Sequence, residues 1–159
     1  MRRKTLDTLL SATGLLLALV LLVAGGLLTW ASTFAQGQVH DQLAAQKITM
    51  PSGKALEDPQ IKPYLEKYAG QEMTTGDQAK AFADHYILVH MNEASGGKTY
   101  AELDREDPVR DVVMNGSFLR ASLFTSVVSF GIAAMAMGLG IVFVLVGAAL
   151  RVVGRPQTA

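Results

Sequence analysis

Residues 9–34 read LLSATGLLLALVLLVAGGLLTWASTF, and residues 121–150 read ASLFTSVVSFGIAAMAMGLGIVFVLVGAAL. Neither stretch contains a charged residue. A transmembrane helix needs roughly 20 mostly apolar residues, because each residue rises about 1.5 Å through a hydrocarbon layer about 30 Å thick. Both stretches exceed that length, so the sequence predicts two membrane-spanning helices and an all-α membrane protein.

The charges that flank the two stretches predict their orientation. Short segments rich in Lys and Arg stay in the cytoplasm. Arg2, Arg3 and Lys4 precede the first stretch, and Arg151 and Arg155 follow the second. We therefore expect a plasma (inner) membrane protein with both termini cytoplasmic and the intervening loop outside. The predicted domains are a cytoplasmic tail (1–8), a first span (9–34), an extracytoplasmic helical domain (35–117), a second span (118–150) and a cytoplasmic tail (151–159).

A cleaved signal peptide is the alternative interpretation of the first stretch. The basic start fits, and Thr33-Phe34-Ala35 is a loose cleavage site made of mostly small residues. The apolar core of a signal peptide is about 7–15 residues long, however. Residues 9–34 are much longer, which favours a retained helix.

Composition excludes several classes of function. The chain has 159 residues, no cysteine, and 14 basic against 14 acidic residues, with the basic excess in the tails and the acidic excess in the loop. Without cysteine there is neither a disulfide framework nor a thiolate metal site. A nucleic-acid-binding protein would need a clustered basic face, so no nucleic-acid partner is expected.

Small residues recur along both stretches at the spacing of a helix-packing seam. Steps of three, four and seven residues correspond to the 3.5-residue period of a left-handed coiled coil. In lipid, small side chains let two backbones approach closely, which apolar burial alone cannot achieve. Whether the seam joins the two spans or two copies of the chain is left open. The predicted packing residues are Ser11, Ala18, Gly25 and Ser32 in the first span and Ser122, Ser126, Ser129, Ala133, Ala136, Gly140 and Gly147 in the second.

The loop between the spans predicts a small helical cap on a two-helix hairpin stalk. Residues 39–47 extend the first span, and Asp58-Pro59 predicts the start of a short helix that ends at Gly70. Thr75 and Gln78 form a capping box for a helix that runs to about residue 94. Asp107-Pro108 could start a helix that pauses at Asn115-Gly116 or continues into the second span.

Histidines are the candidates for a metal site. His90 and Glu93 are three residues apart, the spacing of ligand pairs on one helix face, whereas His85 and His90 are five apart, about 140° around a helix. Two ligands do not make a site, so no metal or other cofactor is expected, with His85, His90 and Glu93 as the only candidates. There is no Gly-x-Ser-x-Gly nucleophile motif, and no catalytic residue is assigned.

Four segments resemble a group of small, uncharacterised two-span membrane proteins of high-GC Gram-positive bacteria. These segments are residues 68–71 (YAGQ), 81–87 (AFADHYI), 97–102 (GKTYAE) and 116–120 (GSFLR). The resemblance implies the two-span topology and an actinobacterial type of source. Some members carry the label aromatic ring-opening dioxygenase. That reaction needs iron held by two His and one carboxylate, and the histidine spacing above gives no such arrangement.

The sequence thus predicts a non-enzymatic integral membrane scaffold or accessory subunit of the cell envelope. It would act through helix packing and an extracytoplasmic protein–protein surface. Its expected partners are the lipid bilayer and either a copy of itself or another envelope membrane protein. Three alternatives stay open: a small-molecule sensor, a pore-forming oligomer and a metal-dependent enzyme.

Overall fold

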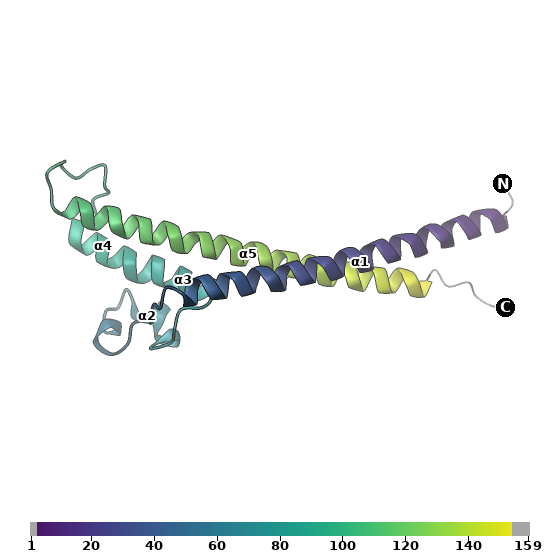
Figure 1. The fold of residues 1–159 in the computed structure, drawn as a ribbon, viewed down its shortest axis with the longest axis horizontal. Helices are drawn as coiled ribbons and strands as arrows, with labels where there is room; N and C mark the ends of the chain where they lie inside the picture. The colour runs from purple at the N-terminus through teal and green to yellow at the C-terminus, as the bar shows by residue number, and fades with distance from the viewer. Residues whose placement is uncertain (1–2, 154–159) are drawn as a thin grey trace. The chain divides into compact units, whose positions relative to one another are not determined.

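Two long helices dominate the computed structural model, which describes residues 3–153. These are α1, Arg3–Ala44, and α5, Val109–Val153 (Figure 1). Their 42 and 45 residues make them about 63 and 68 Å long. Both are long and apolar enough to cross a membrane, and the described residues contain no β-strand. The predicted all-helical fold with two long apolar helices is confirmed.

Contacts along the chain divide it into two compact units. The described residues up to 35 and from 132 onward form the first, which we call the paired-helix unit, and residues 36–131 form the second, which we call the small domain. The predicted domain boundaries follow charge, whereas this division follows packing, so those boundaries stay a prediction. The tails were predicted to include Arg2 and Arg155, but residues 1–2 and 154–159 lie outside the described residues.

Short turns follow α1 inside the small domain. A 3₁₀ turn, Gly53–Leu56, precedes α2, Lys62–Leu65, which continues into a 3₁₀ turn, Glu66–Tyr68. The predicted helix start at Pro59 is wrong. Asp58 instead forms a turn in which its Oδ1 accepts a hydrogen bond from the Gln60 amide at 2.7 Å, and the helix begins only at Lys62.

One nearly continuous helical segment follows, built from α3, Gly76–Phe82, a π-helical turn, Ala83–Ile87, and α4, Leu88–Ser95. The predicted capping box is confirmed, because Thr75 and Gln78 satisfy each other's backbone amides. The segment ends where Gly96 adopts the left-handed conformation, with φ of 63°, which costs a glycine little. The predicted break after residue 94 is therefore confirmed to within one residue.

α5 starts where the sequence predicts and does not pause. The Asp107 carboxylate accepts a hydrogen bond from the Val109 amide at 2.9 Å, which satisfies one amide of the first helical turn. The helix then runs through Asn115 and Gly116 without interruption.

The core of the small domain joins the end of α1 to α3 and α5. Large apolar side chains fill it, as expected for a domain stabilised by removing apolar surface from water. Its main cluster of buried residues comprises Val39, Leu43, Met50, Leu56, Ile61, Leu65, Met73, Ala79, Ala83 and Leu123. A second cluster, made by Met91, Leu103 and Val113, lies between α4 and α5.

Candidate functional site

The paired-helix unit brings together three of the predicted packing residues from each long helix. Ala18, Gly25 and Ser32 of α1 contact Gly147, Gly140 and Ala133 of α5, respectively, and all six are buried. From one contact to the next, the residue number rises by seven on α1 and falls by seven on α5. The two helices therefore run antiparallel along one seven-residue repeat.

Glycine is needed at the centre of these contacts. A Cβ added to Gly25 would lie 2.7 Å from the Gly140 carbonyl oxygen and 2.8 Å from Val144 Cγ2. A Cβ added to Gly140 would lie 2.8 Å from Thr29 Oγ1 and 2.9 Å from the Gly25 carbonyl oxygen. Because real Cβ atoms do not approach that closely, the two backbones can meet only where both side chains are hydrogen atoms.

One hydroxyl hydrogen bond connects the same two helices. Ser32 Oγ donates to the Ala133 carbonyl oxygen at 2.6 Å, and the Ser32 side chain is buried. Thr29, by contrast, donates to the Gly25 carbonyl oxygen of its own helix at 2.8 Å. Ser32 thus adds a polar link to contacts that are otherwise made by small apolar groups.

The other predicted packing residues differ in exposure. Ser11 and Ala136 are partly buried in the paired-helix unit. Ser126 and Ser129 are partly buried and Ser122 is exposed, and all three belong to the small domain. Sequence reasoning missed Thr29 and Val144, which contact the central glycines although neither is a small residue on the repeat.

A network of charged groups joins α3 and the π-helical turn to α5 in the small domain. Arg120 of α5 donates from Nε to the Ala83 carbonyl oxygen at 3.0 Å and from Nη2 to Asp84 Oδ1 at 3.2 Å. Lys80 donates to Asp84 Oδ2 at 2.6 Å. Partial burial raises the pKa of Asp84, but hydrogen bonds from Lys80 and Arg120 and their positive charges outweigh it, so this pKa is lowered below 3.8. The carboxylate is therefore held in its charged form.

The π-helical turn decides which side chains face α5. A π-helical turn holds more residues than an α-helical turn, so it shifts the face that the following residues present. Phe82 and Tyr86 before and within the turn, and Ile87 and Met91 at its end and beyond it, all line the side toward α5. The Met91 thioether lies against Gly116, and a side chain at that position would displace it.

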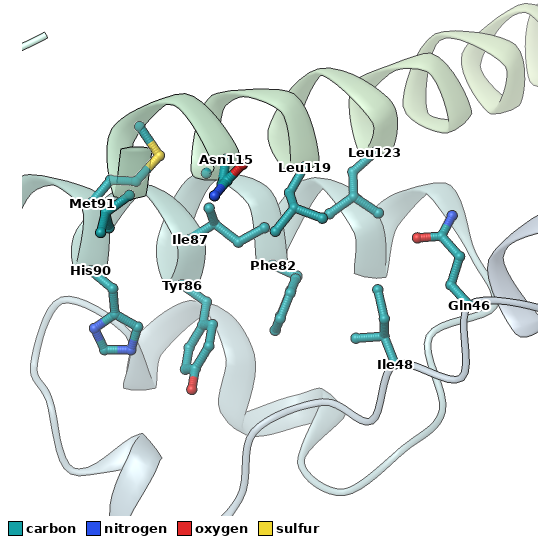
Figure 2. A pocket seen from close by; sticks show the side chains of 12 residues that line it. Gln46, Ile48, Phe82, Tyr86, Ile87, His90, Met91, Asn115, Leu119 and Leu123 are labelled. Carbon is teal, nitrogen blue, oxygen red and sulfur yellow. The ribbon is translucent and has the colours of Figure 1, made fainter. Parts of the chain in front are cut away.

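The small domain contains an open apolar groove of about 640 Å³, which we call the α4–α5 groove (Figure 2). Gln46 and Ile48 lie at one end of it, and His90 and Met91 lie at the other. Its volume falls in the range of ligand-binding clefts, and its lining is mostly apolar, with a few polar groups. The lining residues are Gln46, Ile48, Phe82, Tyr86, Ile87, His90, Met91, Val112, Asn115, Gly116, Leu119 and Leu123.

Ile48 reaches the groove because two short segments pair beside it. The Met73 amide donates to the Ile48 carbonyl oxygen at 2.9 Å, and the Met50 amide donates to the Gln71 carbonyl oxygen at 2.8 Å. These bonds fix the chain immediately after α1. The end wall of the groove is therefore held by backbone hydrogen bonds as well as by packing.

Of the three metal candidates, His90 and Glu93 contact each other, whereas His85 contacts an aromatic ring. His85 stacks on Tyr64 with ring centroids 3.5 Å apart, whereas His90 Nδ1 lies 3.0 Å from Glu93 Oε2. Within residues 3–153, no group of three or more His, Asp or Glu side chains is placed to hold a metal ion. The structure thus gives His90 and Glu93 an ion-pair geometry on the surface and places His85 with an aromatic partner.

Comparisons of the chain with protein-family models, curated proteins and solved structures find no match. The arguments about function therefore rest on the paired-helix unit and on the α4–α5 groove.

Proposed function

We propose that this protein is an integral membrane scaffold or accessory subunit of the cell envelope. The two long helices would form a transmembrane hairpin, with both termini cytoplasmic, and would hold the small domain outside the cytoplasm. The small domain would meet another envelope protein or a second copy of the chain. The resemblance to two-span proteins of high-GC Gram-positive bacteria stays a prediction.

A reversed distribution of side chains in the paired-helix unit carries this proposal. Its buried positions hold Gly, Ala and Ser, while large apolar side chains point outward. In water such exposure would cost roughly 25 cal/mol for each Å² of apolar surface, whereas lipid tails solvate it freely. The exposed side chains of this unit include Leu10, Leu16, Leu19, Val23, Leu27, Trp30, Ile132, Met135, Ile141 and Leu145.

The outer face of α1 supports a membrane boundary near residue 34. Trp30 and Phe34 stack with centroids 5.9 Å apart, and both are exposed. Tryptophan side chains are enriched at membrane–water interfaces. His40 and Asp41, the next ionisable residues of α1, are exposed a few residues further on.

Cysteine labelling tests the topology directly, because the chain has no cysteine of its own. Lys54→Cys and Lys98→Cys should react with a membrane-impermeant maleimide on intact cells. Asp7→Cys should react only after the membrane is permeabilised. Labelling of Asp7→Cys but not Lys98→Cys on intact cells would contradict the proposed orientation.

Association is the second part of the test. Crosslinking in cells, followed by purification in a mild detergent, should recover the chain with a partner or with a second copy. Recovery of the chain only as a monomer, with no crosslinked species, would contradict a scaffold or accessory role.

The α4–α5 groove favours one alternative, a sensor of small apolar molecules. Its volume and apolar lining would suit a compact ligand. On this alternative, a ligand that raises the Tm of the full-length protein in nanodiscs should lose its effect when Leu119 is replaced by Asp. Because the groove is open to one side, it suits the surface of another protein better than it suits a small ligand.

A further inference from the structure

The α4–α5 groove begins where one of three packed helices stops. At the level of Leu123, the end of α1 contributes Val39 and Leu43 to the same core as Ala79 and Ala83. α1 ends at Ala44, while α4 and α5 continue side by side beyond it (Figure 1). The groove is therefore the position that a third helix would occupy if α1 continued.

The residue pattern of α5 leads to the same conclusion. Ala133, Gly140 and Gly147, which α1 contacts in the paired-helix unit, are spaced by seven residues. The same seven-residue steps toward the start of α5 reach Leu119 and Val112. These two residues line the groove and are 54% and 50% exposed. The stripe that meets α1 thus continues as large apolar residues where α1 no longer covers it.

The shape of the groove selects among apolar occupants. It is open along its length, so an acyl chain lying in it would leave one side in water. An amphipathic helix would fill the groove with its apolar face and present its polar face to solvent. From Val112 to Leu123 the groove follows about 16 Å of α5, or roughly three helical turns.

We propose that the α4–α5 groove binds an amphipathic α-helix of a partner protein. This helix would be about three turns long and would lie beyond the end of α1, in line with it. This inference rests on the proposed scaffold function and names the chemistry of the partner. Within residues 36–131, the end of α1, α3, α4 and α5 pack on one another, so a second copy would bring packed helices, rather than one separate helix, to the groove.

Polar groups at the margin of the groove fit such an occupant. Gln46 and Asn115 offer amide groups, and the Tyr86 hydroxyl and the His90 ring offer further hydrogen-bonding atoms. These groups could bond the polar flanks of a helix whose apolar residues, spaced by three or four, enter the groove.

A designed peptide tests the proposal with the full-length protein in nanodiscs. The probe is a fluorescent helix of about 12 residues, with Leu at positions spaced by three and four and Glu and Lys elsewhere. Fluorescence anisotropy should show saturable binding to the protein above the signal from empty nanodiscs. Leu119→Asp should weaken binding about tenfold or more, because it places a charge among the apolar contacts.

Phe118→Asp is the matched control. Phe118 is 66% exposed on the same helix and does not line the groove. It should bind the peptide as the wild type does, and equal Tm values for the two variants would show that both fold. No binding to the wild type, or equal losses in both variants, would overturn the proposal.

Two further readings use the same samples. If a fluorescent fatty acid binds in a Leu119-dependent way and the peptide does not, the occupant is a hydrocarbon chain and the proposal is wrong. If Asn115→Cys joins two copies through a disulfide that the peptide cannot prevent, the occupant is a second copy and the proposal is also wrong. Neither result changes the cysteine-labelling test of the proposed function.

Discussion

The paired-helix unit and the small domain bury opposite kinds of side chain. In the paired-helix unit the contacts are made by Ala18, Gly25, Ala133 and Gly140, and the large apolar residues point outward. The small domain buries residues such as Leu65 and leaves its charged groups exposed or paired. On the proposed function, this difference means that the small domain is suited to water and the paired-helix unit to lipid. The small domain gains stability by removing apolar surface from water, and the helix pair gains it from close backbone contact.

Replacing a leucine by alanine should have the most different effects on the free energy of unfolding when one leucine lies in the core of the small domain and the other faces outward in the paired-helix unit. Leu65→Ala, at a position with 0% exposure, should lower the free energy of unfolding by about 2–5 kcal/mol, because it leaves a cavity in the small domain. Leu16→Ala, at a position 63% exposed in the paired-helix unit, should change it by less than about 0.5 kcal/mol. Titration of the purified protein with a denaturing detergent measures both, and a large loss in Leu16→Ala would contradict the lipid-facing assignment.

The next largest effect should come from filling the helix contact. Gly140→Leu should destabilise the pair by about 1–3 kcal/mol, because its Cβ alone would meet Thr29 and the Gly25 carbonyl. Gly138→Leu is the matched control, since a Cβ added there meets nothing within 4 Å. The rate of disulfide formation between Ser32→Cys and Ala133→Cys reports the pairing. Equal rates in both leucine variants would show that these helices do not depend on the glycine contact.

Sequence reasoning succeeded where the signal is local or periodic. The capping box of Thr75 and Gln78 predicted the start of α3, and the end near residue 94 was predicted to within one residue, because both depend on groups within a few residues. The two apolar helices follow from length and charge alone. The seven-residue spacing in each span could be read from the sequence, but which helix each stripe meets depends on distant contacts.

The groove could not be predicted for two physical reasons. The first is the π-helical turn Ala83–Ile87, which changes the face that Met91 presents and which an α-helical period does not predict. The second is that α1 ends at Ala44. Three residues later, Lys47 adopts a left-handed φ of 52° and the chain changes direction. Arg120 and Asp84, likewise, are 36 residues apart in sequence, so only the fold brings them together.

The Asp84 interactions should give the small domain a pH-dependent contribution to its stability. Because the pKa of Asp84 is lowered in the folded state, its contribution is fully present above the unfolded value of about 3.8 and is lost as the pH falls through the folded pKa. Asp84→Asn should therefore cost about 1 kcal/mol at neutral pH and less in acid.

Unfolding free energies measured between pH 3 and pH 7 test this prediction, with Glu66→Gln as the control. Glu66 pairs with Lys62 at 3.8 Å, but both side chains are more than half exposed, so that pair should contribute little. A difference between wild type and Asp84→Asn that does not shrink in acid would contradict the assigned role of the carboxylate.

The smallest effect should come from the buried hydroxyl between the two long helices. Ser32→Ala removes the hydrogen bond to Ala133 and should cost only about 0.6 kcal/mol, the average for such bonds between membrane helices. Thr33→Ala is the neighbouring control, because Thr33 bonds within its own helix and is exposed. The same detergent titration measures both.

If close backbone contact holds the pair, Gly140→Leu must cost more than Ser32→Ala. The reverse order would mean that hydrogen bonding, rather than the absence of side chains, joins α1 to α5.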